Sequence, residues 1–122
     1  MKILGTDFVT YYVGNFHAAV MFYRDTLGLP LKTYRDRDLW AEFDCGNITL
    51  ALQGGGDIMP GDHAPRIVLA VPDLAAAQTE LKARGVNIVR PPQDDGDGLQ
   101  LELLDPDGNI VVLHQRAVVP PG

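Results

Sequence analysis

Seven residues of this sequence have side chains that suit ligand binding or acid–base chemistry and fall in segments typical of β-strands. They are Phe8, Tyr12, Trp40, Glu42, Arg66, Glu102 and His114. Aromatic rings can stack on a flat ligand or hold a cation over the ring face. A pair of glutamates can act as acid and base, and a buried guanidinium needs an anionic partner. These residue types predict a cleft that binds a small organic molecule.

Each of these residues also has an interpretation without a ligand. The rings are equally typical of core or dimer packing, and Arg66 can form an internal salt bridge with Glu42 or Glu102 instead of anchoring a ligand carboxylate or phosphate. Cys45 stands in a turn without a nearby base, so we expect no nucleophilic role. The glycine run at 54–56 lacks the helix and lysine of a phosphate-binding loop, and we expect it to form a flexible lip over the cleft.

Composition and charge limit the classes of partner. The chain has 122 residues, of which 46% are hydrophobic and 21% are charged, which suits one domain or two half-sized units sharing a core. Sixteen acidic residues against ten Lys and Arg give a formal charge of −6, which disfavours nucleic acid and anionic membranes as partners. A single cysteine and the lack of a long apolar run at the start predict a cytoplasmic protein.

The elements that must position these side chains occur twice in the same order: one strand, one helix and three further strands. Asn15 and Asp73 are suited to cap the two helices, and Gly28 and Gly85 to end them. Segments rich in β-branched and aromatic residues predict the strands. The strands are expected at residues 7–13, 31–35, 39–44 and 47–53, and again at 66–71, 87–90, 98–104 and 109–114.

The two halves also match in sequence, which indicates a duplicated unit. Val13 and Val71 are 58 positions apart (71 − 13 = 58), and GNITLALQ at 46–53 matches GNIVVLHQ at 108–115 with a shift of 62 (108 − 46 = 62). The competing interpretation is convergence of two hairpins on common turn chemistry. We infer two βαβββ units at 1–60 and 61–122, with a short disordered tail at the C-terminus.

Alternation along the strands sorts the side chains between two faces of each unit. Val9 and Tyr11 are expected to face the first helix, and Ile67 and Leu69 the second. The predicted fold is therefore α+β, with two βαβββ repeats forming a curved mixed sheet and both helices on its convex side. On the concave side, alternation places Phe8, Thr10, Tyr12, Trp40, Glu42, Arg66, Glu102, Val112 and His114.

Three motifs carry a resemblance to a known family: FYRDTLGLPL at 22–31, VPDL at 71–74 and LDPDGNI at 104–110. Together they resemble the vicinal oxygen chelate superfamily, which includes glyoxalase I, extradiol dioxygenases, fosfomycin resistance enzymes and bleomycin resistance proteins. The resemblance covers about residues 3–115. It implies the duplicated fold and a homodimer, whereas the chemistry has to be argued from the site, because one fold hosts many functions.

Metal-dependent members of this superfamily hold a divalent ion with one side chain from the first strand and one from the last strand of each repeat. The resemblance places these positions at Phe8, Leu50, Arg66 and Val112, which adds Leu50 to the expected cleft. A register shifted by one residue would instead place Ala51 and Leu113 in the last strands. None of these side chains offers an electron pair to a metal, and arginine is a permanent cation. We therefore expect no metal and no cofactor.

The three histidines leave one alternative metal site open. His17 is expected at a solvated helix start, and His63 in an exposed, mobile loop. His114 is expected in the cleft, where Glu42 or Glu102 could join it in an unconventional site. Polar residues in a cleft more often orient a ligand than chelate an ion.

The favoured function is metal-free binding of an aromatic or cationic drug-like molecule, as in the bleomycin resistance proteins that the chain resembles. Those proteins lack the metal ligands and sequester a drug between subunits. We expect no catalytic residues, and the expected partners are a small organic ligand and a second copy of the chain. The alternatives are a lyase, isomerase or dioxygenase with displaced metal ligands, and a regulatory or structural domain whose cleft is filled.

Overall fold

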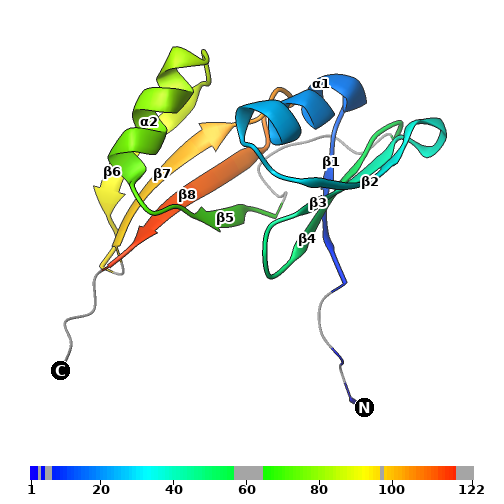
Figure 1. Cartoon of the computed structure of the whole chain (residues 1–122), viewed down its shortest axis with the longest axis horizontal. Coiled ribbons are helices and arrows are strands. Elements are labelled where there is room, and N and C mark those ends of the chain that lie inside the picture. Colours follow the sequence, from blue (N-terminus) through cyan, green and yellow to red (C-terminus); the bar gives the residue numbers. More distant parts are fainter. Residues whose placement is uncertain (3, 5–6, 57–64, 97, 118–122) are drawn as a thin grey trace. The chain divides into compact units, whose positions relative to one another are not determined.

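Both halves of the chain form a four-stranded mixed sheet with a helix on one face (Figure 1). The computed structural model describes residues 1–2, 4, 7–56, 65–96 and 98–117, and the chain divides into the units Met1–Ala64 and Pro65–Gly122. The predicted boundary after residue 60, His63 and the C-terminal tail at 118–122 lie outside the described residues. The prediction of an α+β fold built from two βαβββ units is confirmed.

The first unit begins with β1 (Val9–Tyr12) and α1 (Phe16–Met21), which continues as the π-helical turn η1 (Phe22–Thr26). Its sheet has the order β1-β4-β3-β2, in which β1 and β4 are parallel and the other neighbours are antiparallel. The remaining elements are β2 (Leu31–Arg35), the 3-10 turn η2 (Asp36–Asp38), β3 (Trp40–Asp44) and β4 (Thr49–Gln53).

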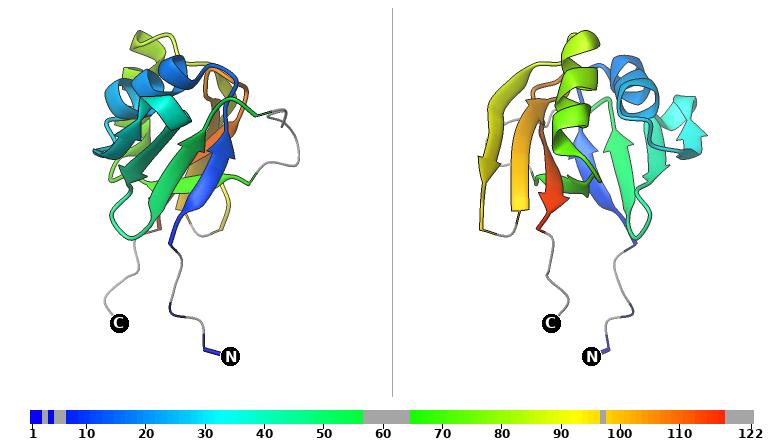
Figure 2. Two further views of the ribbon diagram at one scale, coloured as in Figure 1. Left: turned by 90° about the vertical axis from the view of Figure 1, so that its right-hand side faces the viewer. Right: turned by 60° about the vertical axis from the view of Figure 1, so that its left-hand side comes forward.

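The second unit repeats this arrangement with β5-β8-β7-β6 as its strand order and with β5 parallel to β8. In Figure 2, α2 lies across the sheet, where it contacts β7 and β8. The elements are β5 (Ile67–Ala70), α2 (Leu74–Ala83), β6 (Ile88–Asp94), β7 (Gly98–Leu104) and β8 (Ile110–Arg116).

The predicted helix caps are confirmed in both units. The side chain of Asn15 accepts a hydrogen bond from the backbone N–H of Ala18, and Asp73 does the same for Ala76, each at 3.1 Å. Such a bond satisfies one of the donors that a helix start leaves without a partner. Gly28 and Gly85 follow the two helices with φ of 75° and 74°, a conformation that favours glycine.

The core of each unit lies between its helix and its sheet, as the alternation of side chains predicts. Burying one such large apolar side chain stabilises a protein by about 1.5–3 kcal/mol. In the first unit the buried side chains include Tyr11, Phe16, Val20, Tyr23, Phe43 and Leu52, and in the second Ile67, Leu74, Leu81, Leu101, Leu103 and Val111.

The hairpin turns that precede the last strands differ in length between the units. Asp44 pairs with Thr49 across the β3–β4 turn, whereas Leu104 pairs with Ile110 across the β7–β8 turn. The turns are thus residues 45–48 and 105–109, and the second is one residue longer. Side-chain oxygens of Asp105 accept hydrogen bonds inside the longer turn, among them one of 2.9 Å from Nδ2 of the buried Asn109.

One strand is longer than predicted. A strand was expected at 87–90, but β6 continues to Asp94. Pro91 and Pro92 favour an earlier end, because proline cannot donate a hydrogen bond to a sheet. The pairing with β7 accommodates them by a shift of register between Arg90 and Gln93.

No helix in the described part of the chain has the length and apolar character needed to cross a bilayer. The homodimer and the cytoplasmic location stay predictions.

Candidate functional site

The register of each sheet assigns its residues either to the helix-covered face or to the opposite face, which we call the open face. Residues paired across neighbouring strands point to the same side. Tyr11 and Phe43 are buried on the helix-covered face of the first unit, so the residues that alternate with them belong to its open face. The open faces include Thr10, Tyr12, Trp40, Glu42, Ala51 and Gln53 in the first unit, and Val68, Ala70, Gln100, Glu102, Val112 and His114 in the second.

The residues that precede β1 and β5 belong to the same faces. The ring of Phe8 contacts Trp40, and Arg66 donates a hydrogen bond to Glu102. The sequence-predicted residues are thereby brought together in two groups, and their binding of a ligand stays a prediction. The groups are Phe8, Thr10, Tyr12, Trp40 and Glu42 in the first unit, and Arg66, Glu102, Val112 and His114 in the second.

The predicted orientation of Leu50 is wrong. Leu50 pairs with Val9 and Phe43 on the helix-covered face and is fully buried, so Ala51 takes the open-face position. Matching the two GNI turns ignores the extra residue of the second turn and shifts β4 by one position. A slip of one residue moves every side chain of a strand to the other face. Ala51 and Val112 are the equivalent residues, 61 positions apart (112 − 51 = 61).

The open face of the first unit carries an exposed aromatic cluster. The ring centroids of Phe8 and Trp40 are 5.4 Å apart at an interplanar angle of 81°, an edge-to-face contact. Phe8 is 46% exposed and Tyr12 is 38% exposed. Large rings that stay in water on a sheet face leave apolar area for a ligand to cover.

Trp40 is positioned by its own hydrogen bond to Glu42 and by hydrogen bonds that hold the backbone just before it. Its indole Nε1 donates to Oε1 of Glu42 at 3.2 Å. The preceding Leu39 has the left-handed conformation, with φ 51° and ψ 50°, which is uncommon for a residue with a side chain. The amide Nε2 of Gln53 donates to the carbonyl oxygens of Leu39 at 3.2 Å and of Asp38 at 3.1 Å. Gln53 therefore acts as a positioning residue, which sequence analysis missed because these contacts are made to backbone atoms.

The open face of the second unit is charged at the equivalent places. Nη1 of Arg66 donates to Oε1 of Glu102 at 2.9 Å, so the partner of Arg66 is Glu102. Arg90 of β6 also approaches this carboxylate, with Nε 3.9 Å from Oε2. Sequence analysis missed Arg90. The register of β6 shifts on both sides of this residue, so its position beside Glu102 is known only from the pairing of β6 with β7.

His114 lies close to an acidic residue of the turn between β6 and β7. Its Nε2 is 3.3 Å from Oδ2 of Asp95, but the two groups lack the geometry of a hydrogen bond. Both side chains are mostly buried. The acid beside His114 is thus Asp95, rather than the expected Glu42 or Glu102.

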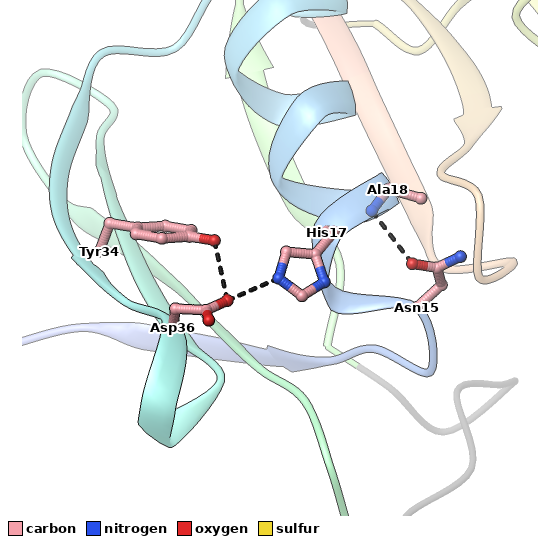
Figure 3. Close-up of polar contacts among 5 residues, drawn as sticks. All are labelled: Asn15, His17, Ala18, Tyr34 and Asp36. Carbon is pink, nitrogen blue, oxygen red and sulfur yellow. Dashed lines mark hydrogen bonds and ion pairs between the residues drawn. The ribbon is translucent and has the colours of Figure 1, made fainter.

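His17 lies at the start of α1 with an exposed side chain, as expected, and it also makes a polar contact (Figure 3). Its Nε2 is 2.6 Å from Oδ1 of Asp36, which also accepts a hydrogen bond from the Tyr34 hydroxyl at 3.1 Å. These hydrogen bonds, first from His17 and then from Tyr34, lower the pKa of the Asp36 carboxyl below its ordinary value. All three side chains are exposed, and they connect the helix start to the end of β2.

Cys45 lies in the β3–β4 turn and is partly buried. Burial, followed by the nearby charge of Asp44, raises the pKa of its thiol. A raised pKa keeps the thiol protonated at neutral pH, and the thiolate is the reactive form. These surroundings disfavour nucleophilic chemistry at Cys45.

Comparison with known proteins decides the family. The family model described as the Glyoxalase/Bleomycin resistance protein/Dioxygenase superfamily matches residues 5–113. The chain belongs to this superfamily. A curated relative from Mycolicibacterium smegmatis, described as an uncharacterized protein, is 34% identical over 118 residues, which cover 93% of this chain and 90% of the relative.

Two solved structures of similar proteins can be aligned with nearly the whole of this chain. TnmS3, an antibiotic binding protein from Streptomyces sp. CB03234, has a TM-score of 0.81 at 26% identity, covering 96% of this chain and 99% of its own. A superfamily member from Sphaerobacter thermophilus DSM 20745 has a TM-score of 0.80 at 25% identity, covering 93% and 98%.

Membership of this superfamily raises the question of whether the chain can hold a divalent ion as its metal-dependent members do. With the corrected register, the four relevant positions are Phe8, Ala51, Arg66 and Val112. Three of these side chains have no donor atom, and the fourth is a cation hydrogen-bonded to Glu102. Among the described residues, no three His, Cys, Asp or Glu side chains are grouped closely enough to hold a metal ion. The residues at these positions do not fit a divalent ion.

Proposed function

We propose that this superfamily member binds a flat aromatic molecule on the open face of its first unit, without the help of a metal ion. The observation that carries the proposal is the edge-to-face pair of the exposed Phe8 and the partly buried Trp40, with Tyr12 exposed on the same face. Phe8 occupies a position at which metal-dependent members place a ligand to the metal. An aromatic ring there favours stacking over coordination.

The polar group beside the rings supports a drug-like ligand that carries a positive charge or a hydrogen-bond donor. Glu42 is partly buried next to Trp40, and it forms no ion pair with a described residue. A carboxylate beside aromatic faces suits a cation, which can also interact with the rings. The similarity to TnmS3, an antibiotic binding protein, supports binding as the function.

Titration of the full chain with 9-aminoacridine, a planar cation, tests the proposal. Trp40 is the only tryptophan, so its indole N–H signal in NMR spectra reports on the first unit alone. We expect saturable shifts of this signal that persist after treatment with a chelator. The proposal fails if neither this cation nor a panel of neutral planar compounds moves the signal. Stoichiometric metal in the purified protein would favour the enzyme alternative.

A substitution at Phe8 distinguishes stacking on the open face from nonspecific binding to exposed rings. Phe8→Ala should weaken binding of 9-aminoacridine by about two- to tenfold, the range expected for one aromatic pair. Tyr34→Ala is the matched control, because Tyr34 is another exposed ring but lies beside Phe16 on the helix-covered side. Equal weakening by both substitutions would argue against the open face as the binding surface.

A further inference from the structure

Two guanidinium groups converge on one carboxylate in the second unit. Arg66 donates to Oε1 of Glu102 at 2.9 Å, and Nε of Arg90 lies 3.9 Å from Oε2. The arginines approach Glu102 from opposite sides. Arg90 lies on β6, where it is paired directly with Glu102 of β7. Arg66 precedes β5, which lies on the other side of β7 beyond β8. The Glu102 side chain is 13% exposed, and those of Arg66 and Arg90 are 49% and 55% exposed.

The charges of this cluster do not cancel. Arginine stays protonated at all relevant pH values, so two positive charges face one negative charge. Neither arginine forms an ion pair with another described residue. Asp95, on the turn after β6, is close to His114 instead. The cluster therefore has a surplus positive charge on a chain whose formal charge is −6.

The hydrogen-bond donors of the cluster are also in surplus. Each guanidinium has five N–H groups. Arg66 directs one nitrogen at Glu102, and the 3.9 Å separation at Arg90 is too long for a hydrogen bond. A salt bridge inside the protein needs only one of the two arginines. The second leaves a half-exposed guanidinium fork with the geometry that recognises a further carboxylate.

We propose that Arg66 and Arg90 bind the carboxylate of a small organic anion, while Glu102 holds the two guanidinium groups in place. A second anion relieves the repulsion between two cations that share one carboxylate. Val68, on the same face and 58% exposed, offers apolar contact to the rest of the ligand. The proposal goes beyond the proposed function, because this site lies on the open face of the second unit alone and takes an anion.

Titration of the full chain with benzoate tests this site, with the neutral benzamide as the matched ligand. The arginine Nε–H signals are followed by NMR and assigned with Arg→Gln variants. Benzoate should shift the signals of Arg66 and Arg90 in a saturable way, and benzamide should leave them in place. Arg66→Gln and Arg90→Gln should each weaken benzoate binding by about tenfold. Arg84→Gln, which removes the 3.0 Å pair with Glu80 on α2, should not change it.

Several results would overturn the assignment. They are the absence of benzoate shifts through the millimolar range, equal shifts with benzamide, or equal weakening by Arg84→Gln. Tighter binding of inorganic phosphate than of benzoate would exclude a carboxylate as the preferred group. A thermal melt of each variant shows that it is folded. The Trp40 signal separates the two proposals, because benzoate can shift the arginines while 9-aminoacridine leaves Trp40 unchanged, or the reverse.

Discussion

The open faces of the two units have the same backbone plan and opposite chemistry. Each has a glutamate on its third strand, Glu42 or Glu102, at equivalent positions. Glu42 accepts from an indole beside an exposed phenyl ring, whereas Glu102 accepts from one guanidinium and lies near a second. The residue before the first strand is part of this difference, because it is Phe8 in one unit and Arg66 in the other. A duplicated sheet thus keeps its core while its open face changes from aromatic to charged.

The equivalence of the two units depends on the corrected register of β4. Leu50→Ala tests this register and should give the largest change in stability. Because Leu50 is buried on the helix-covered face, its truncation should lower the free energy of unfolding by about 3 kcal/mol. Urea denaturation measures the change. Leu104→Ala is the control, since Leu104 lies on the open-face side of β7 and is partly exposed, and it should cost about 1 kcal/mol or less. Similar costs for the two variants would contradict the register.

The two glutamates should differ in their contribution to stability. Glu102→Gln removes the only carboxylate beside two guanidinium groups within the described residues and should destabilise the protein by about 1–2 kcal/mol, discounted for the exposure of the arginines. Glu42→Gln keeps an acceptor for the Trp40 indole and should change stability by less than about 0.5 kcal/mol. Chemical denaturation of both variants makes the comparison, and a larger loss for Glu42→Gln would reverse it.

A further difference concerns the last strand, where Gln53 and His114 are equivalent residues (114 − 53 = 61). Both side chains reach the connection between the second and third strands of their unit. Gln53 makes hydrogen bonds to the Leu39 and Asp38 carbonyl groups there, whereas His114 lies 3.3 Å from Asp95 without hydrogen-bond geometry. Gln53→Leu should therefore cost about 1 kcal/mol. His114→Leu should cost less. Thermal denaturation of the two variants checks this order.

The smallest expected effect concerns the contact between His17 and Asp36, which connects the first helix to its sheet. Because the pKa of Asp36 is lowered in the folded protein, its stabilising contribution is complete above the ordinary value near 4 and is lost as the pH falls through the lower folded-state value. Melting temperatures of the wild type and Asp36→Asn should therefore converge at low pH. A constant difference between pH 6 and pH 2 would contradict this role.

Much of this architecture follows from local sequence signals. The caps Asn15 and Asp73 fix the helix starts, and strand alternation separates Tyr11 from Tyr12, because both depend on neighbouring residues alone. The facing of Leu50 could not be read in this way, since it depends on how many residues the turn contains. Arg90 was missed for a related reason: its place beside Glu102 depends on pairing between strands around two prolines.

The extra residue of the β7–β8 turn also determines how side chains can be transplanted between the halves. An insertion confined to a turn leaves each strand's inward and outward positions intact, so either copy can acquire new surface chemistry without disturbing its interior. Anyone grafting the arginine pair onto the first half should count from paired strands, which gives Phe8 and Thr33 as the recipients of Arg66 and Arg90. Counting from the glycines of the two GNI turns, Gly46 and Gly108, would instead make the buried Leu50 the counterpart of Val112.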